Sequence, residues 1–511
     1  MSTANAQDIG ISAFRRGIIL YFLTLAVALY AMTITIANVA LPQMQGSLSA
    51  TQDQIAWIVT FNIVATAVAT PLTGWLATRF GRRQVMLTSL AGFTLTTLFC
   101  GLADGLGELV FYRVLQGLCG APLAPLANAI VLDTFPRERH GTVSAIFGMG
   151  VVLGPIMAPT VGGYLSEALS WRWVFFMVVP FGVICLLGCW SFIHNRFGAT
   201  RMSLDWTGFV TLALAIGCFQ LMLDRGERQD WFDSPEIVIE AAVALCAFYL
   251  FVVHSLTHER PFLDPQLLKD RCFAVGLFIT ILFGMLNFTP MVLLPPMLQS
   301  LKGYPDSVIG LLLGARGAGT MLGFFVMFFG NRFDPRIWLT IGFSLQAIAG
   351  YQMAQFDINV STFDVAWTSA LQGLGVGFLW VPLTLVTTAT LNPRLLPVGM
   401  SIFHLLRNIG SSVHISLSVA LVIHMSRVNY AGLTENISPY NESLRYDWVT
   451  GFWNLESLRG LTALGGEIQR QAAMIGYINA FYFYTITALA VLPLIVLVGR
   501  RPQEVRLKGR A

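Results

Sequence analysis

Polar side chains interrupt several long apolar segments of the chain, and their spacing is that of one helix face. Arg113, Gln116 and Gly120 recur at i, i+3 and i+7, which places them on one side of a helix. The same spacing links His404, Arg407, Asn408, Ser411 and His414. Because an arginine near the middle of a bilayer costs about 3 kcal/mol, we expect both faces to point into a helix bundle.

As a set, these residues favour a hydrated pathway through the membrane. The residues predicted to line or shape it are Arg113, Gln116, Arg316, Gln372, His404, Arg407 and Asn408. Taken singly, each is explained equally well by hydrogen bonds to a neighbouring helix.

Proton-coupled transport would need a group that titrates within the membrane. No Asp or Glu falls near the middle of an apolar segment, and the nearest carboxylates are Asp224 and Glu240. His404 and His414 are alternative proton carriers, since histidine titrates near neutral pH. For each of the four, a boundary or packing role is the slightly stronger interpretation.

The short connection from Gly74 to Arg83 combines glycines with arginines. Gly74 and Gly81 permit a tight turn, while Arg79, Arg82 and Arg83 can reach helix C-termini and acidic partners. We predict that these contacts hold one conformation shut. An ordinary positively charged loop would explain the charges but not the glycine spacing.

A second motif lies within one apolar segment and consists of Gly150, Gly154, Pro155, Pro159, Gly162 and Gly163. Glycines four apart let two helices approach closely, and prolines break the hydrogen-bond ladder and bend a helix. Helix packing alone would account for the glycine spacing. The two prolines favour an additional role in opening and closing the pathway.

The composition requires a membrane. Of 511 residues, 55% are hydrophobic and only 11% are charged, with a mean hydropathy of +0.67, whereas soluble domains carry about 25% charged residues. The net charge of +4 is too small to indicate a nucleic-acid partner. Seven cysteines without paired spacing predict neither a disulfide nor a metal site. No catalytic cluster or cofactor motif is evident, so we expect no enzyme and no cofactor.

Fourteen apolar runs are long enough to cross a bilayer as helices. They lie near 17-39, 55-77, 85-103, 108-131, 142-164, 173-193, 206-223, 237-257, 273-298, 308-330, 337-355, 365-390, 399-425 and 479-499. Of the 31 Lys and Arg residues, 20 fall in alternate connections that include both termini and 8 in the others, 4 of these in one long loop at about 426-478. This bias predicts that both termini are cytoplasmic.

The two ends of the chain repeat each other. Arg79 and Phe80 correspond to Arg332 and Phe333, and the LQGL that contains Gln116 recurs around Gln372. We therefore expect an all-α protein with two related six-helix bundles, at 1-200 and 259-511, an inserted helix pair at 201-258, and a long periplasmic loop at about 426-478. Duplicated halves around a midplane site are typical of secondary transporters.

Taken together, these motifs resemble the major facilitator superfamily, and within it the fourteen-span drug:proton antiporter branch (EmrB/QacA-like), especially EmrB-type multidrug efflux proteins. The resemblance covers nearly the whole chain and rests on Thr35-Ile-Ala-Asn38-Val-Ala-Leu-Pro42, the Gly74–Arg83 connection, Arg113-Val-Leu-Gln116-Gly117, the Gly150–Gly163 motif, Trp171-Arg172-Trp173 and Leu223-Asp224-Arg225-Gly226. Thr33 and Thr78 depart from it, because the branch usually carries Asp at both positions.

The resemblance implies export of hydrophobic or amphiphilic compounds across the bacterial inner membrane, driven by proton entry. It also implies a periplasmic adaptor of the EmrA type and an outer-membrane channel of the TolC type. Three alternatives remain open: a facilitator without proton coupling, a specific metabolite exporter, and a receptor or scaffold that transports nothing.

Overall fold

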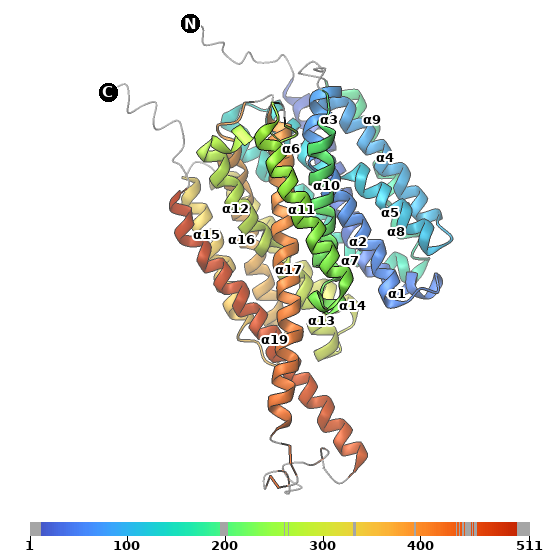
Figure 1. Cartoon of the computed structure of the whole chain (residues 1–511). Helices are drawn as coiled ribbons and strands as arrows, with labels where there is room; N and C mark the ends of the chain where they lie inside the picture. Colours follow the sequence, from blue (N-terminus) through green and yellow to red (C-terminus); the bar gives the residue numbers. More distant parts are fainter. Residues whose placement is uncertain are drawn as a thin grey trace.

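The computed structural model describes residues 12–194, 203–259, 261–263, 265–330, 334–392, 395–435, 437–438, 440–441, 444, 451, 453 and 457–497. Over these residues all regular structure is helical. The first half of the chain contains α1 (Ala13–Ser47), α2 (Gln52–Ala69), α3 (Leu72–Phe80), α4 (Arg82–Leu102), α5 (Leu106–Gly120), α6 (Leu123–Thr134), α7 (His140–Ala168), α8 (Trp173–Phe176) and α9 (Val178–Phe192) (Figure 1).

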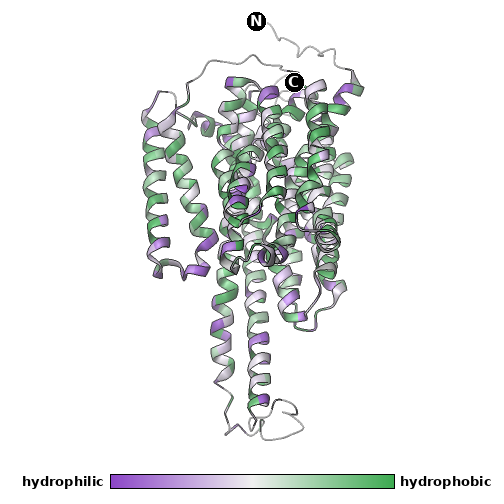
Figure 2. Cartoon of the chain, turned by 90° about the vertical axis from the view of Figure 1, so that its right-hand side faces the viewer, coloured by the Kyte–Doolittle hydropathy of each residue, from purple (hydrophilic) through white to green (hydrophobic). Residues whose placement is uncertain are grey.

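Two helices follow before the second half begins, α10 (Trp206–Arg225) and α11 (Pro235–Thr257). The second half contains α12 (Arg271–Asn287), α13 (Thr289–Lys302), α14 (Asp306–Gly330), α15 (Pro335–Met353), α16 (Thr362–Thr388), α17 (Leu396–Thr434) and α19 (Leu458–Val491). α10 and α11 pack on each other, and α10 packs against α2 and α17. The pair stands beside the bundle in Figure 2.

Local sequence sets where several helices begin and end. Thr51 and Gln54 form a reciprocal capping box at the start of α2, and Asp205 caps α10 by accepting from the Gly208 N–H. These side chains satisfy backbone donors that a helix start leaves unpaired. Gly81 separates α3 from α4 with φ of 89°, a conformation that glycine adopts without steric cost.

Twelve helices among the described residues are long and apolar enough to cross a membrane, or up to 13 if α2 and α3, which meet at a bend of 53°, count as one span. The sequence predicts fourteen. The difference lies at α15, which occupies the predicted segment 337-355 but is not among the candidates. It carries Gln346 and Gln352 among its apolar residues, which lowers its hydropathy.

The predicted loop at about 426-478 is helical over much of its length. α17 continues to Thr434 and α19 already begins at Leu458. Figure 1 shows these two helices (orange and red) leaving the bundle together at its lower end. Hydrophobic residues (green) predominate along the helices of the bundle in Figure 2, as expected for a protein surrounded by lipid.

Each half has its own apolar core. In the first half, Leu23, Phe93 and Val131 belong to one cluster, and in the second half Phe273, Phe343 and Phe403 belong to another. The halves meet at the upper end of the bundle in Figure 1, where α1, α4 and α17 begin. Ala129 and Leu132 of α6 join the core of the second half there.

Candidate functional site

A cavity of about 240 Å³ lies between the two halves. α1, α6 and α7 line it from the first half, and α12, α13, α14, α16 and α17 from the second. Its lining reaches from Phe324 at the upper side to Gly310 on α14, and from Val27 to Thr35 on α1. The cavity therefore extends from mid-bundle towards the lower end.

The cavity wall is largely apolar and aromatic. Rings are supplied by Tyr30, Phe147, Phe288, Phe324 and Trp380. Such rings offer large contact areas that do not depend on the exact shape of a bound molecule.

Arg316 projects from α14 into the cavity lining. Its Nε donates to Gln372 Oε1 at 2.7 Å, and its Nη2 donates to both the backbone and side-chain oxygens of Asn287 at 2.7 and 2.9 Å. Nη1 has no partner among the described residues. Gln372 therefore positions the arginine from α16, and one nitrogen of the guanidinium group remains available to a ligand.

Arg407 is the second positive charge of the cavity, and it lies one turn from His404 on α17. Its guanidinium carbon is 5.3 Å from the centroid of the Trp380 ring, and its Nη2 donates to Asn408 Oδ1 at 3.0 Å. Arg407 Nε and His404 Nε2 are buried and have no hydrogen-bond partner among the described residues. Unpaired buried donors are costly, so both groups are candidates for ligand contact.

Arg113 and Gln116 are not part of the cavity lining. Arg113 is 1% exposed and donates to Gln116 Oε1 at 2.5 Å and to the Ile58 carbonyl at 3.2 Å. Gln116 in turn donates to Thr97 Oγ1 at 2.7 Å. The pair thus connects α2, α4 and α5 inside the first half. Three of the seven predicted pathway residues therefore line the cavity: Arg316, His404 and Arg407. Gln372 is hydrogen-bonded to Arg316, and Asn408 to Arg407. Arg113 and Gln116 lie away from the cavity.

The Gly74–Arg83 connection lies at the upper end, where the halves meet. The prediction of a loop with two turn glycines was wrong for Gly74, which lies within α3, and only Gly81 stands between two helices. A Cβ on Gly74 would stand 2.8 Å from the Val398 Cα, so α3 and α17 touch backbone to backbone. Arg82 pairs with Asp133 of α6 at 3.1 Å, with both side chains 9% exposed, and Arg83 donates to the Trp190 carbonyl at 2.8 Å.

Arg79 stacks within its own segment, 5.5 Å from the Trp75 ring centroid. Of the five predicted gating residues, Gly74 contacts Val398 of the other half. Arg82 and Arg83 tie the connection to its own half, and Gly81 supplies the turn.

The glycine motif of α7 packs against α1. Added Cβ atoms would lie 2.2 Å from Thr24 Cγ2 at Gly150, 2.2 Å from the Ala28 carbonyl oxygen at Gly154, and 2.4 Å from Ile36 Cγ1 at Gly162. Pro155, on the same helix, lines the cavity. α7 is continuous over His140–Ala168 through both prolines, and Gly163 lies near its end. The predicted bend and its role in gating remain predictions.

The predicted proton carriers other than His404 lie outside the cavity lining. Asp224 accepts a hydrogen bond from the Thr60 hydroxyl, and Glu240 lies 3.7 Å from Arg225 in an ion-pair group that joins α10 to α11. His414 is buried in the second half, with Nδ1 2.8 Å from Thr289 Oγ1 and its ring stacked on Phe483.

Thr33 and Thr78 each donate to a carbonyl one turn earlier in their own helix. Neither threonine carries a charge, and no carboxylate is part of the cavity lining among the described residues.

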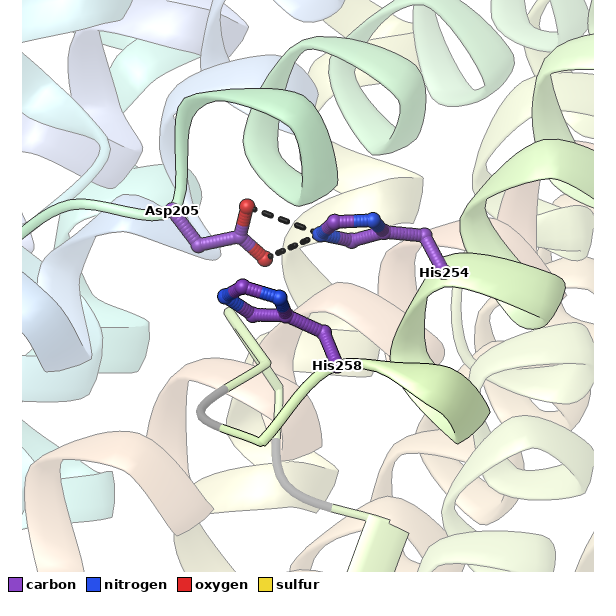
Figure 3. A group of neighbouring side chains, drawn as sticks. All are labelled: Asp205, His254 and His258. Atoms are coloured by element: carbon purple, nitrogen blue, oxygen red, sulfur yellow. Dashed lines mark hydrogen bonds and ion pairs between the residues drawn. The ribbon is translucent and has the colours of Figure 1, made fainter.

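A cluster that the sequence analysis missed joins the upper ends of α10 and α11. It consists of Asp205, His254 and His258 (Figure 3). Burial opposes ionisation of Asp205, but hydrogen bonds from the Gly208 N–H, His254 and the Phe262 N–H outweigh it and hold the pKa of this carboxyl below its usual value. The i, i+4 spacing of the two histidines was the one available signal.

The helical fold agrees with comparisons to known proteins. The family model described as Major Facilitator Superfamily matches residues 23–414. The multidrug export protein EmrB of Haemophilus influenzae is 34% identical over 93% of this chain and 94% of its own length, and the fatty acid resistance protein FarB of Neisseria gonorrhoeae is 32% identical over 93% and 94%.

Among solved structures, a double tryptophan mutant of XylE has a TM-score of 0.63 at 12% identity, with 96% of this chain and 97% of that chain covered. At that identity the likeness shows the fold. The family model and the sequence relatives point to a transporter rather than an enzyme. The chain belongs to the major facilitator superfamily, in which it is a relative of the EmrB-type export proteins.

Proposed function

We propose that this protein exports hydrophobic and amphiphilic small molecules across the bacterial inner membrane by alternating access. The single observation that carries the proposal is the aromatic cavity between the two halves, which holds two arginines and lies in the middle of a membrane-spanning bundle. The names of the relatives EmrB and FarB, which refer to multidrug export and fatty acid resistance, support the same substrate chemistry.

The packing of the halves supports an arrangement that is shut at the upper end. Ala145 of α7 shares an apolar cluster with Phe324, Phe378 and Val381 of the second half, and Gly74 touches Val398. Gly314, nearer the lower end of α14, has no atom within 4 Å of an added Cβ. Transport then requires these upper contacts to open while the lower end closes.

The cavity charge favours anionic or neutral substrates over cations. Arg316 and Arg407 both line it, without a lining carboxylate among the described residues. A carboxylate or a comparable anionic head group can take hydrogen bonds from Arg316 Nη1 and Arg407 Nε, while its apolar tail lies against the aromatic wall.

His404 is the best candidate for proton coupling. It lines the cavity beside Arg407, so that a proton on its ring and an anionic substrate would occupy neighbouring positions. Export with proton entry is therefore our proposal. An uncoupled facilitator is the second candidate, favoured by the lack of a carboxylate in the cavity lining of the described residues.

We further propose that both termini are cytoplasmic, so that the upper end of the bundle faces the cytoplasm and the extended pair α17 and α19 lies in the periplasm. The charge bias of the connections supports this orientation. An EmrA-type adaptor and a TolC-type channel would then complete export through the outer membrane, a proposal that rests on the similarity to EmrB.

Purified protein in lipid vesicles tests the function. An anionic fluorescent fatty acid should be transported, and an imposed pH gradient should accelerate its transport severalfold. Replacing His404 with Gln should abolish the acceleration, whereas the same change at His424, which is exposed on α17, should not. Equal rates with and without the gradient would establish the facilitator instead. No movement of the fatty acid or of its neutral ester would refute both.

A further inference from the structure

The cluster at the upper end of the inserted helix pair brings three metal-binding side chains together. His254 and His258 lie one turn apart near the end of α11, and their rings stack with centroids 4.8 Å apart. His254 Nε2 lies 2.9 and 3.0 Å from the two carboxylate oxygens of Asp205. Figure 3 shows both rings on the same side of this carboxylate, and one ligand atom from each residue lies within 4.8 Å of the others.

We propose that Asp205, His254 and His258 bind a divalent transition metal ion, with Zn²⁺ as the best match. Imidazole nitrogen and carboxylate oxygen are usual zinc ligands, and three protein ligands leave a fourth position for water. Histidines at i and i+4 present both rings from one helix face.

Metal binding needs only a small rearrangement. In a tetrahedral site with bonds of about 2.0–2.1 Å, neighbouring ligand atoms are roughly 3.3 Å apart. The contact between His254 and Asp205 must therefore lengthen by a few tenths of an ångström. His258 is exposed, so its ring can turn towards the carboxylate quickly and against little packing.

The hydrogen bonds that Asp205 makes to the backbone do not explain why His258 lies beside it. One carboxylate oxygen caps α10 through Gly208 N at 2.9 Å, and the other accepts from Phe262 N at 3.0 Å. Neither bond involves His258. A bound metal would connect the end of α11 to the start of α10. Through Phe262 it would also reach the connection that leads to α12.

This site is separate from the cavity, because none of its three residues is part of the cavity lining. Its predicted effect is to stabilise the helix pair and its attachment to the second half. A ligand that binds only the folded state raises the melting temperature in proportion to the logarithm of its concentration.

Full-length protein, purified in detergent, freed of its affinity tag and stripped of metal, tests the proposal with Co²⁺ as a spectroscopic probe and Zn²⁺ as competitor. We expect one Co²⁺ per chain, displacement by Zn²⁺, and a higher melting temperature with Zn²⁺. His258→Ala should weaken binding at least about tenfold, the scale on which even outer-shell partners alter metal affinity.

Asp205→Asn retains a side-chain acceptor for the helix cap and should weaken binding to a similar degree. His424→Ala removes an exposed histidine from α17 and should leave binding unchanged. The proposal is overturned if the unaltered protein binds no stoichiometric Co²⁺ or Zn²⁺, or if His258→Ala and Asp205→Asn bind as tightly as the unaltered protein.

Discussion

The two cavity arginines are held in different ways, and this difference decides which of them should dominate binding. Arg316 donates hydrogen bonds through Nε to Gln372 and through Nη2 to Asn287. Arg407 has a single hydrogen bond, to Asn408, and stacks on Trp380 while its buried Nε has no partner among the described residues. An anionic ligand therefore gains more from pairing with Arg407, because this pairing also satisfies a buried donor.

Arg407→Gln should weaken the apparent affinity for an anionic fatty acid by about 10- to 100-fold, since a hydrogen bond to a charged group contributes about 1.5–3 kcal/mol. The neutral methyl ester of the same acid should be affected far less. Transport in vesicles at varied substrate concentration measures both. Arg228→Gln, at an exposed position between α10 and α11, is the control, and an equal loss for acid and ester would contradict the assigned role.

Helical spacing predicts which polar residues share a face but not what that face meets. Arg316, His404 and Arg407 were predicted to line the pathway and do line the cavity. Arg113 follows the same spacing, yet its partners are Ile58 and Gln116, inside the first half. A buried arginine needs acceptors, and a backbone carbonyl of another helix serves as well as water does. The sequence does not show which backbone carbonyl will lie beside a given arginine.

Many of the glycines allow neighbouring helices to pack closely against each other. A Cβ added to Gly319 of α14 would stand 1.9 Å from the Ala370 carbonyl oxygen, and one added to Gly373 of α16 would stand 1.9 Å from the Arg316 carbonyl oxygen. α14 and α16 therefore pack backbone to backbone beside the cavity. This packing holds Arg316 and Gln372 within hydrogen-bond distance.

Gly319→Ala should destabilise the protein by about 1–3 kcal/mol, because the new methyl group meets backbone that cannot move aside. Gly314→Ala is a matched control on the same helix, since nothing lies within 4 Å of its added Cβ. It should be neutral or stabilise by up to about 1 kcal/mol, as alanine favours helix over glycine. Thermal unfolding of both purified variants measures the difference, and equal melting temperatures would speak against the close packing.

Hydropathy located most helices because lipid-facing surfaces must be apolar along their whole length. It missed the ends of α17 and α19, which continue as helix where the sequence becomes polar and a loop was expected. The backbone hydrogen bonds of a helix form within that helix whether its side chains are polar or apolar. Two helices can therefore continue side by side beyond their apolar segments. α15 lies where the sequence predicted the segment 337-355, and its Gln346 is hydrogen-bonded inside the bundle, where it donates to the Gln372 carbonyl at 2.9 Å.

At the scale of the whole molecule, the contact between α3 and α17 is one of the places where the halves meet, and we propose that it helps to keep the upper end shut. It joins a residue of the glycine and arginine motif, Gly74, to Val398 at the start of α17. The sequence predicted a gating role for this motif. The residue across from it was not predictable, because the two are more than 300 positions apart.

A disulfide between Cys residues at positions 74 and 398 should block transport. A Cβ at position 74 lies 3.1 Å from the Val398 Cβ, slightly nearer than the usual 3.5–4.5 Å of a disulfide, so a small shift suffices. In a background without the seven native cysteines, oxidation should stop vesicle transport and reductant should restore it. Each single-cysteine variant controls for the bulk of the new side chain. Full transport by the oxidised double variant would show that this contact need not open.

The length of α17 carries one more consequence. A single helix contains His404 and Arg407 and then runs unbroken for about 27 residues more to Thr434. At a rise of 1.5 Å per residue, the part of α17 after Arg407 is about 40 Å long, so that a tilt of about 10° at Arg407 displaces its far end by roughly 7 Å. A small rearrangement around a molecule bound in the cavity would therefore move the far end of α17 by several ångströms, and a neighbouring protein in contact with that end would respond to whether the cavity is occupied.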